Sequence, residues 1–118
     1  MSEAAAGQPD MDVQAILDNM TDAFFRTDRD GRLLMASRSV ENLLGWPREA
    51  VLGQNVRALY VDAADRQTFL DLVDAHGGRL SGHDLQFRRR DGSTVWVSAS
   101  ARRLGEDDGG GLEGVLHD

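Results

Sequence analysis

The residue types that most often perform chemistry are sparse and poorly grouped in this sequence. There is no cysteine, and the three histidines, His76, His83 and His117, do not fall at metal-ligand spacings. Disulfides, thiolate metal sites and cysteine nucleophiles are therefore excluded. A G-x-S-x-G nucleophile motif and a glycine-rich phosphate loop with its lysine are also absent from the sequence. We predict a protein that is not an enzyme and has no metal site.

Charged residues are numerous, but their positions favour solvent-exposed faces. Asp62, Asp65, Asp71 and Asp74 have helical spacing, and a solvated face is a simpler interpretation than an acid–base pair. The Arg88-Arg89-Arg90 run stands beside a turn, so charge at a strand end is favoured over a binding patch. The net charge of −7 over 118 residues argues against a nucleic-acid partner.

His83 is the polar side chain that the pattern places nearest to a core. It shares strand parity with Leu85 and Phe87, so all three should point to the same face. A histidine hydrogen-bonded within the fold is the simpler interpretation. Because histidine titrates near neutral pH, a ligand contact or a proton-sensitive switch also stays open.

The elements that position these residues begin near the N-terminus. Residues 1–10 are small and polar, which predicts a disordered lead-in. Residues 11–20 predict a short helix, since apolar residues recur there at i, i+3, i+4 and i+7. Such a helix is marginal alone, so its apolar stripe must pack against another surface. The stripe consists of Val13, Ile16, Leu17 and Met20.

The rest of the chain alternates between strand and helix signals. Strands are predicted over 23–28 and 32–36, joined by an Asp-Gly turn, followed by short helical segments within 37–60. A longer helix is predicted over 63–76. Three strands complete the chain, over 82–89, 93–104 and 112–116. This order predicts an α+β domain, an antiparallel sheet with helices on one side.

The side chains of the longer helix divide into two faces. Phe69, Leu72 and Val73 share the apolar face with His76, whereas Arg66 is expected to lie off it together with neighbouring aspartates.

Strand alternation divides the side chains of segment 93–104 in the same way. Val95, Val97 and Ala99 should face the core, and Trp96 should face outward. An exposed tryptophan on a sheet needs a cover. The predicted helix over 11–20, from the same chain or a partner, is the available cover.

Five segments in this order resemble the PAS domains of bacterial signalling proteins. They are ILDNMTDA at 16–23, F-x-TD-x-DG at 25–31, LLGW with the following RE and LG at 43–53, FRRRDGS with VWV at 87–97, and GV-x-x-D at 114–118. The resemblance extends from residue 12 to residue 118 without large gaps.

This resemblance implies a five-stranded antiparallel sheet in the order 2-1-5-4-3, with helices on one face and an N-terminal flanking helix. We expect a PAS domain over 11–118, made of the helix 11–20 and a core over 22–118. The family also implies a C-terminal linker to an effector, of the histidine kinase or diguanylate cyclase type. The chain ends at Asp118, where that linker would follow, so we expect an excised domain.

The cofactors of the family can be compared with these residues. The flavin adduct and the thioester-linked chromophore both need a cysteine, which is absent. Haem-binding relatives commonly place a histidine in the helix that corresponds to 63–75, and this chain has none before His76, which disfavours haem. Non-covalent flavin stays open, and the cofactor is left undetermined.

The resemblance and the strand parity together define candidate ligand contacts on the inner face. Most of them are apolar, and plain core packing is the simpler interpretation for each. They are Phe25, Thr27, Leu34, Val40, Leu44, Leu59, Phe69, Leu72, Val73, His83, Leu85, Val97 and Ala99.

Three functional hypotheses follow. The first is a sensor that binds a small ligand, the second is a ligand-free dimerisation module, and the third is a small enzyme with a cone-shaped α+β fold. The enzyme would need an isolated acid in its cavity, and no inner-face candidate is Asp or Glu. A homodimer is predicted through Val13, Ile16, Leu17 and Met20 with Trp96. No apolar run reaches the roughly 20 residues of a membrane span, and no secretory signal is present, so we expect a cytoplasmic protein without membrane contact.

Overall fold

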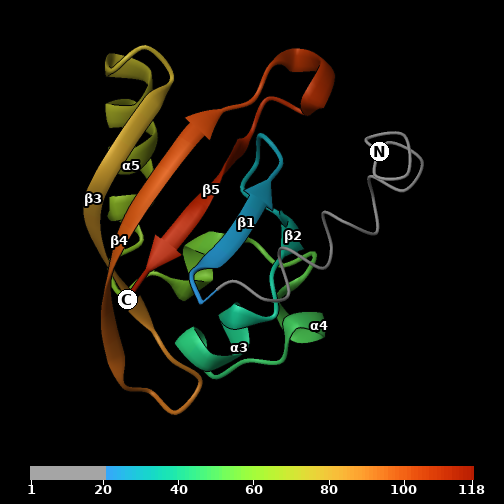
Figure 1. The fold of residues 1–118 in the computed structure, drawn as a ribbon, viewed down its shortest axis with the longest axis vertical. Helices are drawn as coiled ribbons and strands as arrows, with labels where there is room; N and C mark the ends of the chain where they lie inside the picture. Colours follow the sequence, from blue (N-terminus) through green and yellow to red (C-terminus); the bar gives the residue numbers. More distant parts are fainter. Residues whose placement is uncertain (1–20) are drawn as a thin grey trace, which may run out of the picture.

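A five-stranded antiparallel sheet is the framework of the molecule (Figure 1). The computed structural model describes residues 21–118. The strand order is β2-β1-β5-β4-β3, which confirms the predicted order and the α+β fold class. The strands are β1 (Ala23–Thr27), β2 (Leu33–Ala36), β3 (Arg79–Arg88), β4 (Thr94–Arg103) and β5 (Leu112–His117).

The helices lie between β2 and β3 in sequence, apart from one turn before β5. They are α3 (Ser39–Leu44), α4 (Arg48–Val51), η1 (Val56–Leu59), α5 (Ala64–Ala75) and η2 (Glu106–Asp108). In Figure 1, α5 lies behind β3 and β4, and α3 lies near the start of β1. The lead-in predicted over 1–10, and the helix over 11–20 with Val13, Ile16, Leu17 and Met20, lie outside the described residues.

The Asp-Gly turn predicted between the first two strands is confirmed. The Asp28 carboxylate accepts hydrogen bonds from the backbone N–H groups of Asp30 and Arg32, both at 2.9 Å, which closes the connection between β1 and β2. Gly31 follows with φ of 94°, a conformation that glycine adopts without strain. These local bonds place β1 and β2 side by side.

The alternation predicted for β4 is also confirmed. Val95, Val97 and Ala99 are buried, and Ala99 has no exposed surface. Trp96 points the other way and is 62% exposed. The inner face of the sheet therefore carries the core, as the period of two predicts.

The prediction for Leu34 is wrong. Leu34 is 49% exposed, and Leu33 is buried in its place. Thr27 pairs with Leu33 and Arg26 pairs with Met35, so Leu34 is the extra residue of a β-bulge. Because of the bulge, the side chain that points into the core is at position 33 and not at position 34. Counting alternate residues along the sequence does not detect this shift.

The prediction for the faces of α5 is wrong at two positions. Arg66 is only 5% exposed and lies on the same buried face of α5 as Phe69 and Val73. His76, expected on that face, is exposed and bonds through Nδ1 to the Leu72 carbonyl at 2.8 Å. The helix is rotated so that its buried stripe begins one turn earlier than the apolar residues suggest.

The strand β5 passes between β1 and β4 at close range. Ala23, at the start of β1, pairs with Leu116 near the end of β5, and a hydrogen bond of 2.6 Å joins His117 Nδ1 to the Asp22 carboxylate, which is an ion pair when the histidine is protonated. In the middle of β5, a Cβ added to Gly114 would lie 2.0 Å from the Ser100 carbonyl oxygen of β4. Only glycine fits between these strands.

We predict that Gly114→Ala destabilises the fold by at least about 2 kcal/mol, because the strands must separate to admit the methyl group. Urea unfolding of both proteins measures the difference. Gly105→Ala is the matched control, since Gly105 has φ of −72° and nothing within 4 Å of its added Cβ. Equal urea midpoints for G114A and the unmodified protein would contradict the prediction, because they would show that β4 and β5 leave room for a methyl group at position 114.

Candidate functional site

A cavity lies between the inner face of the sheet and the helices that cover it. About 40 Å³ of this space is open to the centres of water-sized molecules. Side chains of the sheet, of α3, of α5 and of the segment around η1 line it, and most of them are apolar. Such an apolar hollow with few polar groups is the usual form of a small-molecule site.

Many of the candidates from the sequence meet at this cavity. Those that line it are Phe25, Thr27, Val40, Leu44, Leu59, Phe69 and Leu85. They come from β1, α3, η1, α5 and β3, so the fold gathers residues that are far apart in sequence. Contact with a ligand stays a prediction for each of them.

The remaining candidates lie elsewhere. Val73, Val97 and Ala99 are buried in the core but do not line the cavity, and Leu72 is half-buried. His83 is half-buried and stacks on Phe69, with ring centroids 5.6 Å apart and an interplanar angle of 19°. His83 therefore supports a ring of the cavity wall and does not line the cavity itself.

The polar part of the wall contains two residues that were not expected there, Tyr60 and Arg66. The Arg66 guanidinium donates from Nη2 to the Thr27 hydroxyl at 3.4 Å, and that hydroxyl also accepts the backbone N–H of Leu112 at 3.2 Å. The available signal was helical spacing, because Arg66 precedes Phe69 and Val73 by three and seven positions. Its charge concealed that signal.

Burial raises the pKa of Tyr60, although a hydrogen bond and the positive charge of Arg66 act in the opposite direction. The phenol therefore stays neutral at physiological pH. Its ring packs edge-on against Phe87 at 4.7 Å between centroids, which fixes the hydroxyl beside Arg66.

The outer face of the sheet is a second candidate surface. A shallow groove there is lined by apolar and polar side chains that include Phe24, Ser100 and Val115. Trp96 is exposed on the same face, on β4, which lies beside the edge strand β3. These features agree with a surface that accepts another chain segment.

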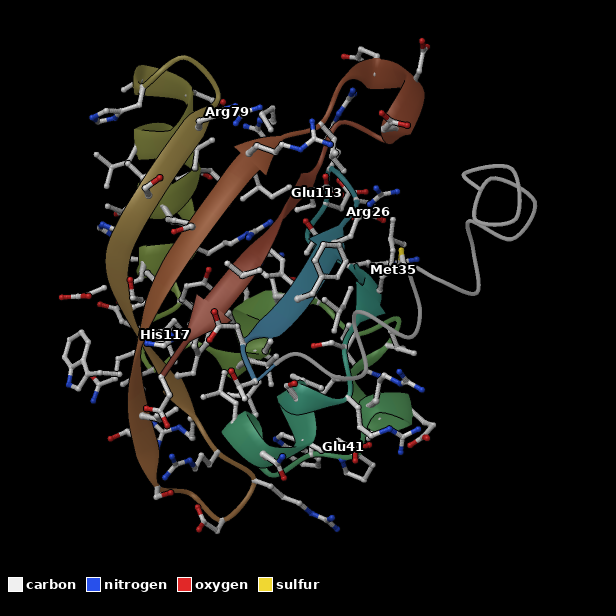
Figure 2. The ribbon with its side chains drawn as sticks, viewed as in Figure 1. Arg26, Met35, Glu41, Arg79, Glu113 and His117 are labelled. Carbon is white, nitrogen blue, oxygen red and sulfur yellow. The ribbon has the colours of Figure 1, made fainter. Side chains whose placement is uncertain are left out.

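An ion triad spans three strands on this outer face. Glu113 of β5 pairs with Arg26 of β1 at 2.7 Å and with Arg102 of β4 at 2.5 Å. Figure 2 shows Arg26 and Glu113 next to each other, with Met35 on the neighbouring strand. Desolvation is the largest single effect on Glu113 and opposes its ionisation, but the hydrogen bonds and the positive charges of both arginines together outweigh it, so the pKa of Glu113 is lowered.

Neither a metal cluster nor a membrane-spanning helix is found in the part of the chain that the structure describes. Among residues 21–118, no three His, Cys, Asp or Glu side chains gather in positions that could hold a metal ion. None of the helices over the same range has the length and apolar character needed to cross a lipid bilayer.

Comparison with known proteins places this arrangement in context. The model of the PAS fold family matches residues 11–118. No curated protein matches the sequence significantly.

Solved structures share the fold. A PAS domain of an HTR-like protein from Haloarcula marismortui has a TM-score of 0.79 and 24% identity, with 98% of this chain and 96% of that one covered. A domain of a sensory box sensor histidine kinase/response regulator from Geobacter sulfurreducens has a TM-score of 0.75 and 20% identity, with 96% of each covered. The PAS domain of a LuxR-family transcriptional regulator from Burkholderia thailandensis, in complex with ethanol, has a TM-score of 0.73 and 14% identity, with 89% and 95% covered.

The outer triad predicts how stability depends on pH. Since the folded-state pKa of Glu113 is lowered, its contribution is present at neutral pH and is lost as the pH falls through that pKa. Glu113→Gln should lower the free energy of unfolding by up to about 1 kcal/mol at neutral pH, because both arginines are partly exposed. The difference should shrink in acid. Urea titrations across pH measure it, with the exposed Asp107→Asn as control; a pH-independent difference would contradict the triad.

Proposed function

Because the chain belongs to the PAS fold family, we propose that it is the sensory and signal-relay domain of a longer bacterial signalling protein. In this proposal it binds a small ligand inside the fold and pairs with a second copy through its outer face. The domain occupies residues 11–118, with a helix over 11–20 and a core over 22–118. The observation that carries the proposal is the largely apolar cavity between the sheet and its covering helices.

The lining of the cavity supports a small organic ligand. Its wall is apolar except for the side chains of Thr27, Tyr60 and Arg66. A site of this kind buries an apolar body and orients it through few polar contacts. The PAS domain from Burkholderia thailandensis, which was found with ethanol, supports a ligand of this small size.

The output of the domain is proposed to lie in an attached effector. We propose an effector of the histidine kinase or diguanylate cyclase type. The related domain from Geobacter sulfurreducens is part of a sensor histidine kinase/response regulator, which supports the first of these two types. We place the protein in the cytoplasm and give the domain itself no catalytic role, since signal transfer needs a change in conformation or pairing and no reaction at the cavity.

A ligand-free dimerisation module is the second candidate, and the size of the cavity favours it. About 40 Å³ is small beside the roughly 300–1,000 Å³ of pockets for drug-sized ligands. In that case the cavity is a packing defect of the core and only the outer face functions. Exposed Trp96 on the outer face supports pairing in both candidates.

Ligand binding predicts a retained or recruited small molecule. Native mass spectrometry of the purified domain, with and without added short-chain alcohols, should show a bound species that disappears on denaturation. Phe69→Trp should abolish it by filling the space, since Phe69 lines the cavity and is 1% exposed. Leu52→Trp, at an exposed position away from the cavity, is the matched control. A spectrum with only the free protein under all conditions would favour the ligand-free module.

Pairing through the outer face predicts a dimer that charge disrupts. Val13→Glu with Leu17→Glu should produce monomers in sedimentation experiments, because the glutamates would be buried in the interface. Trp96→Glu should act in the same direction. Leu52→Glu, at an exposed position where α4 ends, is the control and should stay dimeric. Dimers that persist in both interface variants would remove this surface from the proposal.

A further inference from the structure

Arg66 places a positive charge in the wall of an otherwise apolar cavity. Its side chain comes from the first turn of α5 and is only 5% exposed. Arginine is seldom buried to this extent without a charged partner. The partners of Arg66 therefore decide what the cavity can accept.

The protein offers this guanidinium two hydroxyl groups. Thr27 accepts at 3.4 Å, a long hydrogen bond, and it already accepts the Leu112 N–H. Tyr60 is the second partner. A guanidinium has more N–H donors than two hydroxyl oxygens can satisfy. Some of its hydrogen-bonding capacity is left for another molecule.

No protein anion neutralises this charge among residues 21–118. The ion pairs of that stretch of the chain involve other arginines or His117, and no carboxylate lies within 4 Å of Arg66. Tyr60 does not supply a negative charge, because burial keeps its phenol protonated. Asp65 acts on Tyr60 through its charge but forms no ion pair with Arg66. The cation is buried and unpaired within the described residues.

An anionic ligand would remove this deficit. A buried charge without a partner is costly, and a carboxylate can accept two parallel N–H bonds from one guanidinium. The ligand would thus gain a charge-assisted contact, and the protein would regain a counter-charge.

We propose that the ligand of this cavity is a short-chain monocarboxylate whose carboxylate binds Arg66. The inference rests on the proposed ligand-binding function and specifies the chemistry of the same site. The apolar tail would pack among Val40, Leu44 and Phe69, and the small volume limits it to a few carbons. No second cationic side chain from residues 21–118 lines the cavity, so a second carboxylate would be left unpaired.

The first test uses the unmodified protein and a matched pair of probes. Sodium propionate and neutral propionamide have nearly the same shape, and both are titrated at constant ionic strength while backbone amide signals are followed by NMR. Propionate should bind about tenfold more tightly or better, as expected for a hydrogen-bonded charge. It should also raise the melting temperature saturably.

The second test changes the arginine. Arg66→Gln keeps a hydrogen-bonding side chain but removes the charge and shortens the side chain, so it should remove the preference for propionate over propionamide, while propionamide binds as before. Arg38→Gln, at an exposed position outside the cavity, should keep the preference. If Arg66→Gln does not fold, the comparison of the two probes on the unmodified protein still tests whether the cavity prefers a carboxylate.

The outcomes separate the two proposals. Equal affinity for propionate and propionamide would overturn the carboxylate inference and leave the ligand-binding function in place. A preference that survives Arg66→Gln would show that another group holds the carboxylate and would equally overturn it. Binding of neither probe, together with no bound alcohol in native mass spectra, would overturn both in favour of a ligand-free module.

Discussion

The hydrogen bonding of β5 between β1 and β4 is the constraint on which both candidate surfaces depend. Segments from the two ends of the described chain meet there in one antiparallel register, with Gly114 admitting the close approach of β4. Because side chains alternate across a sheet, this register assigns every residue of the central strands to one face. If the register of a strand shifted by one residue, its side chains on the cavity wall would move to the outer surface and those on the outer surface would move to the cavity wall.

The cavity combines apolar packing with a buried charge, and the two normally conflict in a protein core. Apolar side chains from β1, α3, α5 and β3 supply the burial that stabilises the domain. Among them the fold retains Arg66, which a purely structural core would replace with an apolar residue at little cost or at a gain. A charge kept at such a position is more simply explained by a function than by stability. The two hydroxyls beside it hold its orientation and leave its charge uncompensated.

The sequence was sufficient wherever a feature depends on neighbouring residues. The first Asp-Gly turn and the alternation around Trp96 were correct. The strand order, which is non-local, was correct because it was taken from the family resemblance. Leu34 was misplaced because a bulge is a property of two paired strands and has no mark in one of them. Arg66 was misplaced because the rotation of α5 is set by the sheet it packs on, and charge alone suggested solvent. Non-local geometry therefore accounts for both errors.

The meeting of Asp22 and His117 at one end of the β1–β5 pair has a mechanical consequence. A load that pulls these two residues away from each other would act across the ladder and not along it, so its hydrogen bonds would break in succession, as in a zipper. Such an arrangement yields to a weaker tension than a sheared pair of strands, in which all the bonds resist together. A segment attached at either end would therefore transmit force to β5, the central strand of the sheet, and through β5 to the wall of the cavity.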